Sequence, residues 1–226
     1  MVDAADMIVS LFLGAAGLAV GFSTPQTVGW IIAYKRRAKD AAPAQEGFSL
    51  PVRLLLTLLS TAVWALAGLV MDSIAAAVLV SLLFSTAVLI AVIDLRIRLI
   101  PNELVLFLLA IGTAFQIASY GLRALPGSLL CMAGMMVLFT LAAAFVGFGK
   151  VGAGDVKLAG AMGLALGYPG IITALVVLCA ALLLFSLGGI LAGKLTRKSM
   201  LPFAPFMSAG MAAALLCVVL RIAPLF

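Results

Sequence analysis

Apolar segments long enough to cross a lipid bilayer recur from one end of the chain to the other. A helix needs about 20 predominantly apolar residues to span the hydrocarbon core. Hydrophobic residues make up 65% of the 226 and charged residues only 10%, whereas a soluble domain has roughly 25% charged residues. The alternating pattern typical of a membrane β-barrel is absent from these segments. The sequence therefore predicts an all-α, polytopic membrane helix bundle.

The apolar runs and the breakers between them predict about eight transmembrane segments. These are residues 7–34, 52–71, 74–94, 102–119, 126–147, 154–167, 169–193 and 201–222. The sixth would rise only about 21 Å, less than the ~30 Å hydrocarbon core. It either joins the seventh through the Gly167 to Gly170 stretch or crosses a locally thin region. The first segment follows Asp3 and Asp6 rather than basic residues, so we expect a retained helix and not a cleaved signal peptide.

The only polar linker in the chain suggests its domain organisation. It runs from Lys35 to Phe48, between the first two predicted helices, and is basic. We therefore expect residues 1–73 to form an N-terminal two-helix segment with a short basic cytoplasmic linker. Residues 74–226 would form a six-helix core.

The distribution of basic residues predicts the orientation of the bundle. Of the fourteen Lys and Arg, only Arg123 and Arg221 fall on one side. The others fall on the opposite side: Lys35, Arg36, Arg37, Lys39, Arg53, Arg96, Arg98, Lys150, Lys157, Lys194, Arg197 and Lys198. By the positive-inside rule, this larger group lies in the cytoplasm and the N-terminus outside. Anionic lipid headgroups explain the net charge of +6 without a nucleic-acid partner.

Several chemistries are disfavoured by residues that the chain lacks. There is no His, which excludes His-assisted hydrolysis and the common His zinc sites. Cys131, Cys179 and Cys217 each lie inside a predicted span and form no Cys-x-x-Cys pair, so the sequence predicts no metal site, no disulfide framework and no cofactor.

Two of the eight acidic residues lie at the ends of predicted membrane helices on the cytoplasmic side. Asp94 ends a long apolar stretch, and Asp155 follows Gly152-Ala153-Gly154 at the start of another. Ionisable residues in membrane segments are candidates for a functional site. Two carboxylates that share one proton can hydrolyse a peptide bond, because one activates water while the other protonates the carbonyl.

Structural and non-catalytic interpretations stand beside this one. Asp155 is also in a place where Asp commonly caps a helix, and Asp94 would pair with nearby basic residues at the headgroup level. Lys157 would orient a substrate carbonyl or extend to the headgroups, and Asn102 would cap the fourth helix. A transporter or channel would carry rare carboxylates too, although nearer mid-span. A non-catalytic membrane scaffold would keep the fold without cleaving.

Three segments resemble those of the type IV prepilin peptidases, a family of membrane aspartyl proteases. Gly152-Ala153-Gly154-Asp155-Val156-Lys157-Leu158 is similar to the family's GxGD segment. Asp94, followed by Ile100-Pro101-Asn102, resembles its other aspartate segment. Leu201-Pro202-Phe203-Ala204-Pro205-Phe206 resembles the start of its last helix. The three matches occur in the family's order and lie within residues 74–226.

The resemblance implies a function, a substrate and a set of site residues. It implies an endopeptidase of a bacterial or archaeal cytoplasmic membrane that removes the leader from type IV pilin or pseudopilin precursors at the cytoplasmic face. Asp94 and Asp155 would be catalytic, and Gly152, Gly154, Lys157 and Pro205 would bind substrate or shape the loops. Larger members of the family carry a Cys-containing cytoplasmic domain and methylate the new N-terminus. The linker here has no Cys, so no methylation domain is recognisable.

Overall fold

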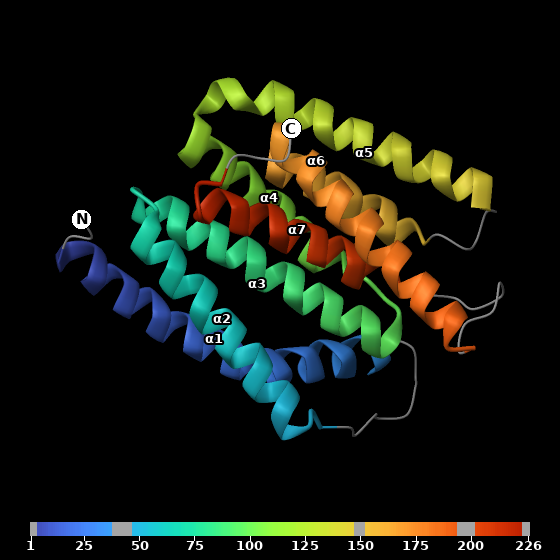
Figure 1. The fold of residues 1–226 in the computed structure, drawn as a ribbon, viewed down its shortest axis with the longest axis horizontal. Coiled ribbons are helices and arrows are strands. Elements are labelled where there is room, and N and C mark those ends of the chain that lie inside the picture. Colours follow the sequence, from blue (N-terminus) through green and yellow to red (C-terminus); the bar gives the residue numbers. More distant parts are fainter. Residues whose placement is uncertain (1–3, 38–46, 147–151, 194–201, 223–226) are drawn as a thin grey trace. The chain divides into compact units, whose positions relative to one another are not determined.

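The computed structural model describes residues 4–37, 47–146, 152–193 and 202–222. Within these ranges it contains α-helices, one 3-10 helix (η1) and no strand (Figure 1). The elements are α1 (Ala4–Arg37), α2 (Leu50–Val70), α3 (Ile74–Ile97), α4 (Asn102–Tyr120), η1 (Leu122–Ala124), α5 (Leu125–Val146), α6 (Ala153–Leu191) and α7 (Ala204–Val219). Their bounds agree closely with the predicted segments, and the all-α prediction is confirmed.

The helices have the length and composition of membrane spans. In the described part of the chain, six of them are long and apolar enough to cross a bilayer, which confirms the polytopic membrane helix bundle. The remaining helix, α7, is apolar but has only 16 residues. It is shorter than the predicted segment 201–222, because the helix begins only after Phe203.

The chain divides into two compact units, Met1–Ser85 and Thr86–Phe226. The boundary falls within α3, so this helix contributes its first half to the first unit and its second half to the second. The predicted division into residues 1–73 and 74–226 concerns function rather than packing, and it stays a prediction.

In the first unit, α1 and α2 approach closely along small residues. A Cβ atom added at Gly17 would lie 2.6 Å from Cβ of Trp64, and one added at Gly21 would lie 2.6 Å from Cα of Thr57. Small residues allow this proximity between membrane helices. The Ser10 hydroxyl donates to the Ala65 carbonyl at 2.9 Å, which ties the same two helices together.

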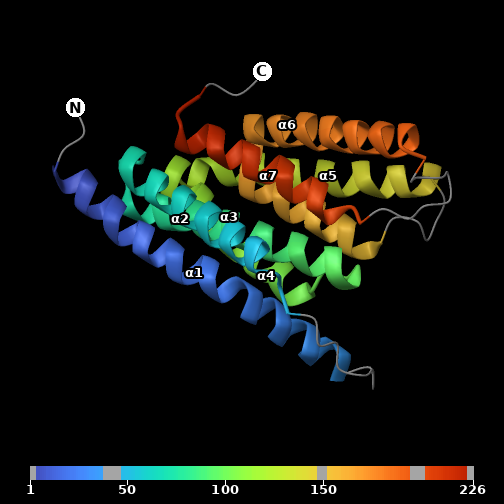
Figure 2. The ribbon, with the colours of Figure 1, turned by 60° about the horizontal axis from the view of Figure 1, so that its bottom comes forward.

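In the second unit, α6 consists of two helical arms. The backbone leaves helical geometry at Gly167 (φ 58°, ψ −172°) and Tyr168, a φ/ψ combination that is essentially confined to glycine. Both ribbon views show the second arm turning back along the first (Figures 1 and 2). The structure thus separates two segments that correspond to the predicted sixth and seventh, residues 154–167 and 169–193.

A buried side chain from α4 stabilises this turn. In an unbroken helix the Ala165 carbonyl would accept from the N–H of residue 169, but that residue is Pro169, which has no N–H. Gln116, almost fully buried in α4, donates its Nε2 to the Ala165 carbonyl at 2.9 Å instead. The break in α6 therefore leaves no unpaired carbonyl at this point.

Candidate active site

The two aspartates singled out by the sequence lie at the same end of the second unit. Asp94 is in the last turn of α3, and Asp155 is in the first turn of α6. We call this end, where α3 finishes and α4 and α6 begin, the aspartate end (Figure 1). The opposite end, with η1, the Gly167 turn of α6 and the last residues of α7, is the turn end (Figure 2).

Asp94 is buried, with only 5% of its surface exposed, and it is held by a distant part of the chain. Its Oδ2 accepts a hydrogen bond from the backbone N–H of Ala204, 110 positions later, at 3.3 Å. Ala204 is the first residue of α7. Burial of a carboxylate is costly unless it is hydrogen-bonded, so the start of α7 both covers Asp94 and orients it.

Asp155 is half-buried and is held locally. Its Oδ2 accepts from the backbone N–H of Gly152 at 3.0 Å, while its own N–H donates to the Gly152 carbonyl at 3.0 Å. An acid in this position also suits the positive end of the helix dipole. The capping role that the structural interpretation predicts for Asp155 is therefore present, and it uses one of the two carboxylate oxygens.

The two carboxylates lie close enough to interact electrostatically, since the charge of Asp155 acts on Asp94. The guanidinium of Arg98, just beyond the end of α3, attracts Asp94. The hydrogen bonds that described residues make to the two aspartates go to the Oδ2 atoms. Two neighbouring carboxylates held in this way are the groups that shared-proton acid–base chemistry uses.

The two candidate glycines differ in what they allow. Gly152 has an ordinary extended backbone (φ −73°), and a Cβ there would contact Asp155 Oδ2 at 3.4 Å. A Cβ at Gly154 would lie 3.2 Å from Cβ of Ile100, which is tighter than ordinary contact. Gly154 therefore lets the segment before Pro101 pack directly against the start of α6.

Lys157 is tied to the start of α4. Its Nζ donates to Oδ1 of Asn102 at 3.1 Å, and the pair is exposed. The expectation that Asn102 caps this helix is wrong: Pro101 occupies the N-cap position without a side-chain hydrogen bond, and Asn102 is already helical. Asn102 instead joins α4 to α6 at the aspartate end.

Pro205 and its neighbour have different roles. Pro205 lies in the first turn of α7 and is half-buried. Next to it, the backbone N–H of Ala204 holds Asp94, a contact that the sequence analysis missed. The Pro-Phe-Ala-Pro segment is recognisable in the sequence, but the sequence does not identify the donor within it, because every residue except proline has a backbone N–H.

Residues 81–220 match the model of the type IV leader peptidase family. Over 143 residues the chain is 32% identical to the prepilin leader peptidase/N-methyltransferase of Bacillus subtilis (strain 168). The aligned stretch covers 63% of this chain and 55% of that relative. The chain therefore spans little more than half the length of the curated relative. No solved structure matches the chain.

Proposed function

Because the chain belongs to the type IV leader peptidase family, we propose that it is a membrane aspartyl endopeptidase that removes the leader peptide from type IV pilin or pseudopilin precursors. The observation that carries the proposal is that Asp94 and Asp155 lie at the same end of the second unit. Each is held through Oδ2 by a backbone N–H, and their charges interact.

The proposed reaction is general acid–base hydrolysis of one peptide bond. A water molecule between the two carboxylates gives a proton to the ionised one and attacks the scissile carbonyl carbon. The protonated carboxylate gives its proton to the carbonyl oxygen, which forms a tetrahedral diol. The C–N bond then breaks as the leaving nitrogen takes the proton that the first carboxylate received from water, while one diol hydroxyl returns a proton to the second carboxylate. The products are a carboxylic acid and an amine, and the two carboxylates return to their starting protonation states.

Burial and anchoring fit the aspartates for these roles. Asp94 is almost enclosed and is fixed from α7, while the more accessible Asp155 is fixed by its own helix start. Preorganised groups need little rearrangement during reaction. We place this end of the unit at the cytoplasmic membrane face, since most basic residues of the chain lie on the same predicted side.

The site is at helix ends rather than at mid-span, and this favours proteolysis over transport. Transporter sites generally lie near the bilayer midplane in discontinuous helices. Near the interface, water reaches the carboxylates and a substrate strand can unwind. A leader that ends in Gly would assist, because Gly weakens a helix by about 1 kcal/mol relative to Ala.

The test is cleavage of pilin precursors co-expressed with the protein in a membrane. The wild type is compared with Asp94→Asn and Asp155→Asn, which keep the side-chain shape and remove the carboxylate. We expect each variant to process precursor at least about 100-fold more slowly, the range for loss of general acid–base catalysis. Masses of precursor and mature protein report the cleavage position.

Asp72→Asn is the matched control, because Asp72 is an exposed aspartate between α2 and α3. It should process precursor at the wild-type rate. Normal processing by both aspartate variants would refute the catalytic assignment. Several different precursors left intact by the wild type would refute the pilin substrate and favour a non-catalytic scaffold.

A further inference from the structure

The first turn of α7 holds Asp94 of α3 through one backbone donor, the N–H of Ala204. The N–H of Phe206 bonds inside the turn, to the Phe203 carbonyl at 3.1 Å, and Pro205 has no N–H. An acidic side chain at a helix N-terminus is also attracted by the helix dipole. The orientation of Asp94 therefore depends on where the start of α7 lies.

Two aromatic pairs flank Ala204 in the sequence. Phe203, just before it, packs edge-on against Phe139 of α5, with ring centroids 5.9 Å apart and ring planes at 84°. Phe206, two residues after it, packs against Phe185 of α6, with centroids 5.4 Å apart and planes at 64°. Aromatic pairs favour such edge-to-face arrangements at centroid separations of roughly 4.5–7 Å. The start of α7 is therefore fixed against two different helices, on both sides of the residue that supplies the donor.

The break in α6 brings Phe185 to the start of α7. Phe185 lies eighteen residues after Gly167, which is about 27 Å along the second arm. Because this arm turns back along the first (Figures 1 and 2), it returns toward the aspartate end. On the way, it packs so closely on α7 that a Cβ added at Gly210 would collide with the Ala174 carbonyl oxygen. The second arm thus supports α7 from its middle to its start.

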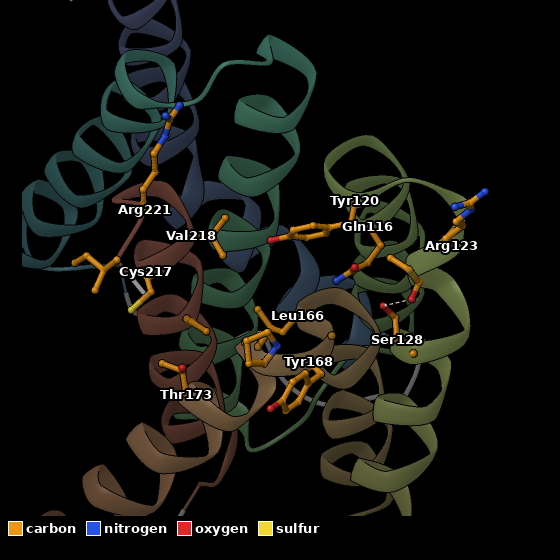
Figure 3. Close-up of a pocket in the computed structure, with 17 residues that line it drawn as sticks. Gln116, Tyr120, Arg123, Ser128, Leu166, Tyr168, Thr173, Cys217, Val218 and Arg221 are labelled. Atoms are coloured by element: carbon orange, nitrogen blue, oxygen red, sulfur yellow. Dashed lines mark hydrogen bonds between the residues drawn. The ribbon is translucent and has the colours of Figure 1, made fainter. Parts of the chain in front are cut away.

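These contacts are separate from a cavity of about 620 Å³ at the turn end (Figure 3). Both α6 and α7 contribute to its lining, as do Arg123 and Arg221 from distant segments. The α7 residues that line it begin at Ala214, four positions after Gly210. Gly210 and the aromatic pairs therefore lie nearer to the aspartate end than the cavity does.

We propose that Phe139 and Phe185 are positioning residues for the peptidase reaction: they hold the start of α7, which in turn orients the carboxylate of Asp94. This role rests on the peptidase function proposed above. Displacing a catalytic group by about 1 Å can lower a rate about 100-fold, so a modest loosening of α7 is enough to slow the reaction. Leucine in place of either ring keeps an apolar side chain but removes the edge-to-face contact.

Hydrogen exchange tests the hold on α7 without any substrate. The purified full chain is studied in detergent, and mass spectrometry follows amide exchange in peptides that cover residues 202–210. We expect Phe139→Leu and Phe185→Leu to accelerate this exchange about two- to tenfold, the range that an edge-to-face pair contributes. Phe145→Leu is the control on α5, because the Phe145 side chain is 90% exposed, and it should leave the exchange unchanged.

Cleavage of a pilin precursor tests the positioning role. In Phe139→Leu and Phe185→Leu we expect kcat to fall about two- to tenfold while KM stays unchanged, at a temperature where each variant is folded. Gln116→Leu is the comparison for stability alone, since it removes a hydrogen bond at the turn end. It should lower the unfolding temperature and keep the wild-type kcat. Phe185→Tyr keeps the ring, and the half-exposed site leaves room for a hydroxyl, so this variant should also keep the wild-type kcat.

A double-variant cycle tests whether Phe185 and Phe206 act as one contact. Each ring loses the same partner when the other is replaced. Phe185→Leu combined with Phe206→Leu should therefore be no slower than the slower of the two single variants. Losses of kcat that multiply would overturn the pairing of these rings as the cause.

The outcomes separate the positioning role from the function on which it rests. Unchanged exchange at the start of α7 in both leucine variants would overturn the role. Faster exchange with an unchanged kcat would overturn it too and leave the peptidase function intact, whereas a wild type that cleaves no precursor would refute both. A Gln116→Leu variant as slow as the phenylalanine variants would reduce the rings to a structural role. If Phe139→Leu fails to fold, the more exposed Phe185 carries the test.

Discussion

The two ends of the second unit use polar groups in opposite ways. At the aspartate end, backbone N–H groups hold carboxylates: the start of α7, at Ala204, holds Asp94, and the start of α6, at Gly152, holds Asp155. At the turn end, the Gln116 side chain satisfies a backbone carbonyl that the break in α6 leaves without its helical partner. The first arrangement orients the carboxylates to which we assign the proposed chemistry, and the second supplies a hydrogen-bond partner to the backbone.

From this difference we expect the aspartate end to control peptidase activity and the turn end to control stability. Hydrogen bonds at the aspartate end orient the two carboxylates to which we assign the proposed chemistry. At the turn end, the hydrogen bond from Gln116 satisfies a buried backbone carbonyl. A buried polar group left without a partner lowers the free energy of unfolding. Substitutions at the turn end should therefore lower stability, while substitutions at the aspartate end should lower peptidase rate with less effect on stability.

The largest effect on stability is expected from Gly167→Ala at the turn. The substitution forces a Cβ into a backbone conformation essentially confined to glycine, at 3.0 Å from Nε2 of Gln116. Such strain costs on the order of 1–3 kcal/mol. Thermal unfolding in detergent measures the change. Gly170→Ala is the control, because its Cβ would make ordinary contact with Leu166 at 3.6 Å. Equal stability of the two variants would contradict the assignment of strain to Gly167.

A smaller loss of stability is expected from Gln116→Leu. The change preserves bulk but leaves the buried Ala165 carbonyl without the donor that replaces the missing N–H of Pro169. The cost is about 1–2 kcal/mol, given the range for unpaired groups and for polar contacts between membrane helices. Thr113→Val serves for comparison, since the Thr113 hydroxyl donates within its own helix, to the Leu109 carbonyl. A variant as stable as wild type would show that the turn does not need Gln116.

At the aspartate end, Gly154→Ala should reduce the peptidase rate about three- to tenfold, or roughly 1 kcal/mol in activation free energy. Its Cβ would lie 3.2 Å from Cβ of Ile100, so Ile100 or the start of α6 must give by a few tenths of an ångström. We expect part of this adjustment to reach Asp155, which is the next residue in the chain. Initial rates of precursor cleavage measure the effect. Gly152→Ala, with ordinary contact at 3.4 Å, should be less impaired, and the reverse order would contradict this explanation.

The smallest effect is expected from Lys157→Met. The variant removes an exposed hydrogen bond to Asn102, and surface substitutions of this kind usually change stability by less than about 0.5 kcal/mol. Asn102→Ala removes the other partner, and the double variant should be no worse than either single one. Unfolding and cleavage assays are run on all three. A tenfold loss of rate in Lys157→Met alone would instead give Lys157 a part in the chemistry.

Much of the fold was predictable because membrane insertion imposes strong local rules. Apolar length and breakers predicted every described α-helix but not the short 3-10 helix η1. The Gly167 to Gly170 stretch was recognised as the point where two segments meet. Two further details were not predicted. Asn102 looked like a helix cap, but its Oδ1 accepts a hydrogen bond from Lys157 instead. The partner of a side chain at a helix start depends on which groups the packing of the helices brings near it. The sequence did not identify Ala204 as the hydrogen-bond donor to Asp94, because the donor is its backbone N–H and not its side chain.

The sequence by itself determined the all-helical membrane class, the number and position of the apolar segments, and the two acids that stand out in a chain poor in charge. These follow from composition and local periodicity, which each segment carries alone. Only the tertiary structure decided that Asp94 is covered by α7, that Gln116 completes the break in α6, and that Arg123 and Arg221 line one cavity. Such contacts join residues far apart in the chain, so their geometry depends on how the helices pack and not on any single segment.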